Sequence, residues 1–305
     1  MITFIILGII QGAVLGLLAI GLVLVYKGTR VFNFAQGEFA TAAGFFLFIF
    51  LTMFGGIKAA NSPPSVFIYL PAIMLALIAV AALGFLVERL IVRPLFDAPR
   101  VTLLVATAGL SLLMLSVELL IGGTEVRQVP PIVGGTAFGL AGATVTWQQL
   151  ITVFVLGGLA LGLAYFFKRT DLGLAVLATS QESVATELVG IGTRRISSFV
   201  WTFAAVLGAT AGILQAPDST FEPFFMTRNF LLLAFTAAVV GGITSLAGAF
   251  AGGQVIGIVS QLATYFDRTY IHDHIDIPGL PNLIIFILLV TVLITRPKGL
   301  LGTEA

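Results

Sequence analysis

The chain has 305 residues, of which 58% are hydrophobic and 10% are charged, and its mean hydropathy is +1.10. These values lie outside the range of soluble globular domains and indicate a membrane protein with several spans. A net charge of +1 gives no strongly basic surface for nucleic acid. The absence of cysteine excludes disulfides, thiol catalysis and cysteine-based metal sites.

About nine segments are apolar over the roughly 20 residues that a helix needs to cross a bilayer. We therefore expect an all-α polytopic membrane protein, with about 8 to 10 transmembrane helices in a single domain over residues 1–305. The first segment lacks a cleavable signal pattern and is expected to remain as a span. The expected spans are Ile2 to Tyr26, Ala35 to Phe54, Ser65 to Val87, Val101 to Ile121, Gln149 to Phe167, Ile196 to Leu214, Phe230 to Ile243, Ala249 to Tyr265 and Leu283 to Ile294.

Some of these spans have irregular features. The segment from Ala35 to Phe54 either crosses the bilayer or enters it and returns to the same side. The two spans around Gly241 to Gly248 are short, as is typical of broken or tilted helices. Gly8, Gly12 and Gly16 follow one another at four-residue spacing, which favours close helix packing within the chain, with a subunit contact as the alternative.

The distribution of Lys and Arg predicts the orientation. With nine crossings, only Lys58, Arg127, Arg228 and Arg268 of the 15 basic residues fall on one side, and the other eleven fall on the opposite side. Because cytoplasmic loops are enriched in Lys and Arg, the side with eleven should be cytoplasmic. We therefore expect an external N-terminus and a cytoplasmic C-terminus.

The segment from Val31 to Phe39 is the least lipid-like part of any span. Asn33, Gln36, Gly37 and Glu38 interrupt its apolar sequence. Irregular backbone survives at membrane depth only inside protein or beside a polar cavity, so we expect a helix break that lines such a cavity. An ion pair between Glu38 and Arg30 at the interface is the alternative. The other acid within a span, Glu118, is close to the end of its helix, where a carboxylate costs less.

The loop from about residue 168 to residue 195 is predicted to contain a short amphipathic helix. Thr179 and Glu182 have the spacing of a capping box at its start, and Gly190 is placed just beyond its end. Val184, Leu188 and Ile191 would share one face. So short a helix is marginal alone in water. It should therefore dock either on its own bundle or in a groove on a partner subunit.

The other polar segments carry little chemistry. No phosphate-binding loop of the GxxxxGK[ST] type occurs, so this chain is not expected to hydrolyse nucleotide. His272 and His274 flank Asp273 without a third ligand at typical spacing, so no metal site is expected. The stretches Gly122 to Trp147 and Asp267 to Asp276 are candidate docking surfaces on the external side.

Four stretches in the same order resemble the permease subunits of ABC importers for branched-chain amino acids, of the LivH/LivM type. The intact sequence Asn33-Phe34-Ala35-Gln36-Gly37-Glu38 is most similar to the LivH-like members. The four stretches are Gly21 to Gly44, Ser180 to Leu214, Val239 to Gly253 and Arg296 to Gly302.

This resemblance implies roles for residues in three of the stretches. The helix in the loop would be the coupling helix that contacts the ATPase, through Thr179, Glu182, Ala185, Glu187, Leu188 and Gly190. Candidates for the translocation path are Asn33, Phe34, Gln36, Gly37, Glu38, Gly241, Gly242, Ser245 and Gly248.

The resemblance also implies partners. The chain would bind no cofactor itself, while ATP and Mg would bind two cytoplasmic ATPase subunits. It would pair with a second permease, a LivM-like chain, in a bacterial or archaeal plasma membrane, and receive Leu, Ile or Val from an external solute-binding protein. Urea, short amides or other small polar solutes are alternative substrates. A stand-alone secondary carrier or channel is a further alternative, but it would need more ionisable groups within the spans than Glu38 and Glu118.

Overall fold

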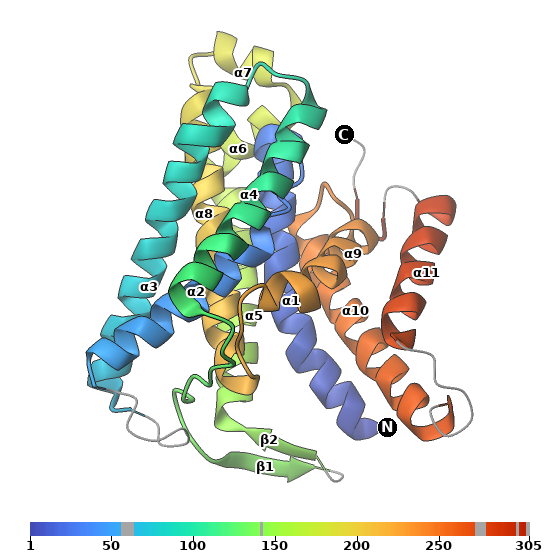
Figure 1. Ribbon diagram of the computed structural model, residues 1–305. Coiled ribbons are helices and arrows are strands. Elements are labelled where there is room, and N and C mark those ends of the chain that lie inside the picture. The colour runs from blue at the N-terminus through green and yellow to red at the C-terminus, as the bar shows by residue number, and fades with distance from the viewer. Residues whose placement is uncertain (56–63, 141–142, 272–278, 297–298, 303–305) are drawn as a thin grey trace.

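The protein is a helical bundle with one small β-hairpin (Figure 1). The computed structural model describes residues 1–55, 64–140, 143–271, 279–296 and 299–302. Its elements are α1 Ile2–Thr29, α2 Gln36–Met53, α3 Val66–Val87, α4 Arg100–Gly122, β1 Thr136–Leu140, β2 Ala143–Thr146, α5 Trp147–Arg169, α6 Asp171–Gln181, α7 Ser183–Leu188, α8 Thr193–Gln215, α9 Leu232–Gly241, α10 Leu246–Phe266 and α11 Leu280–Thr295.

The expected all-α polytopic fold is confirmed. Seven helices in the described part of the chain are long and apolar enough to cross a membrane. Two shorter apolar helices, Thr227–Gly241 and Leu280–Thr295, accompany them. The α2 helix, which could have been a re-entrant segment, has 18 residues and is among the seven. Figure 1 shows it running obliquely from the middle of the bundle towards the end that carries the hairpin.

The α1 helix forms the centre of the bundle, where every residue from Gly12 to Val25 is buried. Its glycines face those of α10. A Cβ atom on Gly253 would lie 2.3 Å from the Cα atom of Gly16, and one on Gly257 would lie 2.4 Å from the carbonyl oxygen of Gly8. The glycine spacing therefore serves close packing within this chain, because only glycine lets the two backbones approach this closely.

The β-hairpin was not predicted from the sequence. It forms part of the connection between α4 and α5, with Phe138 opposite Val145 in an antiparallel pair and an irregularity between Thr136 and Phe138. Thr146 then begins α5 with a capping box, in which its hydroxyl accepts the Gln149 N–H at 3.2 Å. In Figure 1 the hairpin and the N-terminus lie at one end of the bundle, and α7 lies at the other.

Candidate functional site

The loop between α5 and α8 forms the outermost point of one end of the bundle (Figure 1). It contains two helices, where one helix beginning near Thr179 was predicted. Thr179 instead lies inside α6, and its hydroxyl donates to the carbonyl of Ala175 at 2.8 Å. Glu182 has an extended backbone, with φ at −146°, and separates α6 from α7 without a side-chain capping bond. The predicted capping box was therefore wrong. A threonine hydroxyl can bond the preceding turn of its own helix instead of capping the next one.

The end of α7 is as predicted. Gly190 has φ at +88°, the left-handed conformation that favours glycine. Its N–H donates to the Glu187 carbonyl at 2.9 Å, and the Ile191 N–H donates to the Thr186 carbonyl at 3.2 Å. These two bonds form a Schellman motif, which terminates the helix and fixes the direction of the chain that follows.

The C-terminal end of α7 presents exposed apolar side chains. Thr186 is buried on the inner side, whereas Leu188 and Val189 are 84% and 75% exposed. The predicted coupling residue Thr179 is buried, and the exposed members of that set are Glu182, Ala185, Glu187, Leu188 and Gly190. A six-residue helix with an exposed apolar end gains stability by docking on another surface.

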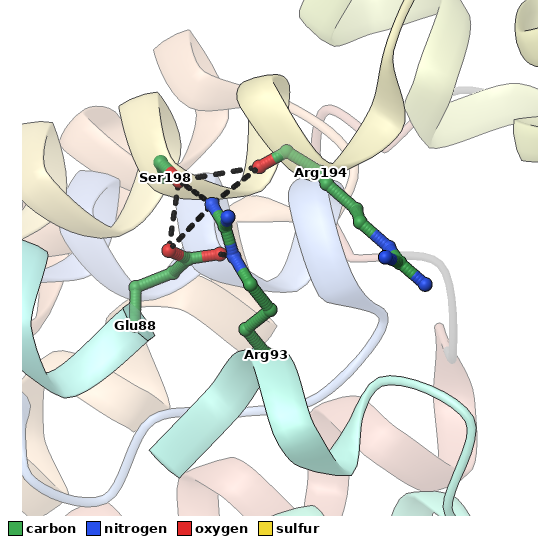
Figure 2. A network of polar contacts seen from close by, with 4 residues as sticks. All are labelled: Glu88, Arg93, Arg194 and Ser198. Carbon is green, nitrogen blue, oxygen red and sulfur yellow. Dashed lines mark hydrogen bonds and ion pairs between the residues drawn. The ribbon is translucent and has the colours of Figure 1, made fainter. Parts of the chain in front are cut away.

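A partly buried ionic network joins the end of α3 to the first turns of α8 (Figure 2). The α3 helix continues as a π-helical turn, Glu88–Val92, and Glu88 is fully buried. Its carboxylate accepts from Arg93 at 3.2 Å and from the Ser198 hydroxyl at 2.7 Å. Arg93 also donates to Ser198 at 2.6 Å. These contacts fix the first turns of α8, which follow α7 directly, against the end of α3.

This network was not predicted from the sequence. Residues five apart face each other on a π-helical turn but not on an ordinary α-helix, where residues three or four apart are neighbours. Glu88 and Arg93 therefore gave no pairing signal. A Glu at the end of an apolar span was the only available indication of a buried partner.

The break between α1 and α2 is connected to the same loop. Arg30 has a left-handed backbone, with φ at 56°, and its guanidinium donates to the carbonyl of Ser180 near the end of α6. The alternative ion pair between Arg30 and Glu38 is therefore wrong. On the other side of the break, the Phe34 N–H and the Thr107 hydroxyl of α4 are 3.3 Å apart.

Most polar groups of the break are satisfied within the protein. Asn33 and Gln36 are buried, and the Gln36 amide donates to the Ala204 carbonyl of α8 at 2.8 Å. The Asn33 side chain accepts the Ala35 N–H at 3.0 Å. A Cβ atom on Gly37 would lie 2.2 Å from Thr227 Oγ1, so this position requires glycine. The path candidate Phe34 is half-buried. The predicted helix break is present, and its amides serve helix packing.

Glu38 differs from these amides. Its Oε1 accepts from Ser111 of α4 at 3.4 Å, while its Oε2 is buried without a hydrogen-bond partner in the described residues. Glu118 of α4 accepts the Phe224 N–H at 3.2 Å and also has one buried oxygen, Oε1, without such a partner. The two carboxyl groups are neighbours, but no hydrogen bond joins them in the described part of the chain.

The remaining path candidates form the turn between α9 and α10. Gly242 has φ at +110°, and the Ser245 hydroxyl accepts the Gly248 N–H at 3.0 Å to cap α10. A Cβ atom on Gly241 would lie 2.0 Å from the Gly248 carbonyl oxygen. The expected tight turn is therefore present. The C-terminal stretch packs on it, because the Leu301 N–H donates to the Gly241 carbonyl at 3.0 Å.

The fold and this site define a class: a polytopic membrane protein with a short, exposed helix at one end that is linked by polar contacts to the interior of the bundle. Comparison with known proteins then gives the family. Residues 4–293 match the family described as the permease component of the branched-chain amino acid transport system, so the chain belongs to that family.

Individual relatives match over nearly their full length. The chain is 29% identical over 303 residues to the high-affinity branched-chain amino acid transport system permease protein BraD of Pseudomonas aeruginosa, covering 97% of this chain and 94% of BraD. It is 28% identical to the permease protein LivH of Escherichia coli, over 97% of this chain and 93% of LivH. It is also 28% identical to the probable LivH of Methanocaldococcus jannaschii, over 97% and 91%.

A solved structure has the same overall fold. PsaBC from Streptococcus pneumoniae in complex with Fab matches 97% of this chain and 91% of the solved chain, with a TM-score of 0.50. At 14% sequence identity, this likeness shows the fold alone.

Proposed function

We propose that this chain is a permease subunit of an ATP-driven importer and forms part of the membrane path for branched-chain amino acids. The family match over residues 4–293 carries this proposal, together with relatives that are named for the transport of those amino acids. The exposed apolar end of α7 supports this proposal, because a permease without its own nucleotide site needs a surface that binds an ATPase and moves with it.

Two sets of polar contacts suggest how a movement of the ATPase is transmitted to the membrane-spanning helices. The α7 helix would bind a groove on the ATPase and move with it. The Glu88–Arg93–Ser198 network would pass the movement to α3 and α8. The contact between Arg30 and the Ser180 carbonyl would pass it to the break between α1 and α2. The second route starts in the loop between α5 and α8, and the first starts in the first turns of α8, which follow that loop.

The assembly that we propose contains a second, LivM-like permease, two cytoplasmic ATPase subunits that bind ATP and Mg, and an external solute-binding protein. The chain itself binds no cofactor or metal in this proposal. The end with α7 and the C-terminus would face the cytoplasm of a bacterial or archaeal cell, and the N-terminus and hairpin would face outwards. Charge supports this orientation, because eleven of the 15 Lys and Arg residues belong to the α7 side in the predicted topology.

Purification of the tagged chain from its native membrane in mild detergent tests the assembly. Two nucleotide-binding subunits and a second permease should be recovered with it, as identified by mass spectrometry. Reproducible recovery of the folded chain alone would contradict the proposal and favour a stand-alone carrier. Urea or short amides remain the alternative substrates, and they are distinguished by uptake measurements on the recovered complex.

A further inference from the structure

Three buried oxygen atoms that have no hydrogen-bond partner among the described residues lie where α2, α4 and the π-helical turn Thr227–Leu231 meet. They are Oε2 of Glu38, Oε1 of Glu118 and Oγ1 of Thr227. The Glu38 carboxyl group lies beside both of the other side chains, and neither pair has the geometry of a hydrogen bond. Glu38 is 0% exposed and Glu118 is 7% exposed, so water does not replace the missing partners at the surface.

Acids buried in this position of a membrane protein are not explained by helix packing alone. Ser111, which contacts Glu38, lies eleven residues after Arg100, the first residue of α4. At about 1.5 Å per residue this is about 17 Å, so Ser111 and the Glu38 carboxylate beside it are near the middle of a hydrocarbon core of roughly 30 Å, while Glu118 is nearer the end of α4. Neither acid forms an ion pair with any of the described residues. Buried acids within membrane spans mark substrate or ion pathways.

An apolar cavity of about 370 Å³, open on the outer side of the bundle, reaches Glu118 of this cluster. It lies between α2, α4 and the end of α3, and Glu118 is its one acidic lining residue. Its other lining residues are apolar and include Phe45, Leu86, Met114 and Val117. The volume is within the range of roughly 300 to 1,000 Å³ that small-molecule sites occupy.

We infer that Glu38, Glu118 and Thr227 bind the α-ammonium group of an aliphatic amino acid during its passage, and that the adjoining apolar cavity receives its side chain. An ammonium group has three N–H donors, which matches the three acceptor atoms that lack partners. One carboxylate balances its charge, and the second supplies a further acceptor. This inference rests on the proposed function and deepens it, because it names the residues that recognise the substrate within the permease.

The variants Glu38→Gln, Glu118→Gln and Thr227→Val test the site in the complete complex. Glutamine keeps the shape of the side chain, and its carbonyl oxygen can still accept the Phe224 N–H in place of Glu118. Glu125→Gln is the matched control, because Glu125 is an exposed acid seven residues after Glu118. Recovery of the partner subunits with each variant shows that it has folded and assembled.

The first readout is uptake of L-leucine per ATP hydrolysed in proteoliposomes. We expect at least a tenfold loss for each Glu variant, a smaller loss for Thr227→Val and none for the control. The second readout is binding to the complex without its solute-binding protein. The wild-type complex should bind L-leucine but not 4-methylpentanoate, which lacks the ammonium group. In the Glu variants, L-leucine should bind no better than 4-methylpentanoate.

The outcomes separate this inference from the proposed function. The ammonium site would be overturned, and the transport role left intact, if the wild-type complex takes up leucine and both Glu variants do so within twofold of the wild-type level. Equal binding of leucine and 4-methylpentanoate would also overturn it. A well-assembled wild-type complex that does not transport leucine would overturn both.

Discussion

At the scale of single residues, glycine determines how closely the central helices pack. Gly253 of α10 lies against the backbone of Gly16, so a methyl group there has no room. A Cβ atom added at Gly158 of α5 would have no neighbouring atom within 4 Å, and this glycine is exposed on the outside of the bundle. The two positions therefore allow the same substitution to be compared in a crowded and an open site.

We predict that Gly253→Ala destabilises the purified chain by about 1–3 kcal/mol, since overpacking a close contact forces the backbones apart. Gly158→Ala should be neutral or stabilising by up to ~1 kcal/mol, because alanine is the better helix former. The free energy of unfolding of both variants is measured in detergent by monitoring the loss of the helical circular dichroism signal. Equal stability of the two variants would contradict the packing described for α1 and α10.

At the scale of elements, the partly buried network between α3 and α8 should show strong coupling between Glu88 and Arg93. A double-mutant cycle of Glu88→Ala and Arg93→Ala isolates the interaction between the two side chains. We expect a coupling free energy above ~1 kcal/mol, because Glu88 is buried and shares Ser198 with Arg93. The pair of Glu222 and Arg228 is the control, with side chains 29% and 60% exposed, and it should give less than about 1 kcal/mol.

The α7 helix leads to a second prediction at this scale. Leu188→Glu places a charge on its exposed apolar end and should abolish recovery of the ATPase subunits while leaving the melting temperature of the chain unchanged. Val126→Glu is the control, because Val126 is also exposed but lies in the connection after α4. Normal recovery of the ATPases with Leu188→Glu would exclude α7 as their docking element.

The sequence predicted these elements unevenly, for physical reasons. The apolar spans were predictable because a helix needs about 20 apolar residues to cross a bilayer. The position of Gly190 at the end of α7 was predictable because glycine adopts the left-handed conformation most easily. The break at Glu182 was not, because Glu is a good helix former and only tertiary packing separates α6 from α7. The neighbours of Glu38 were also unpredictable, since Ser111 and Glu118 are distant in sequence and approach it only when α2 packs against α4.

At the scale of the whole molecule, orientation in the membrane can be measured directly. The chain contains no cysteine, so a single introduced cysteine is a clean label site. Glu125→Cys should react with a membrane-impermeant maleimide added to intact cells, whereas Glu187→Cys should react only after the membrane is opened. Both positions are exposed in the structure. The reverse labelling pattern would place α7 outside and contradict its contact with an ATPase.

The central claim is that this chain carries branched-chain amino acids through the membrane at the expense of ATP. The most direct measurement is uptake of radiolabelled L-leucine into proteoliposomes that contain the complete complex, with ATP enclosed on the α7 side and the solute-binding protein on the other. We predict uptake that requires ATP and is competed by isoleucine and valine but not by urea. Leucine uptake that proceeds without ATP, or competition by urea alone, would contradict the account.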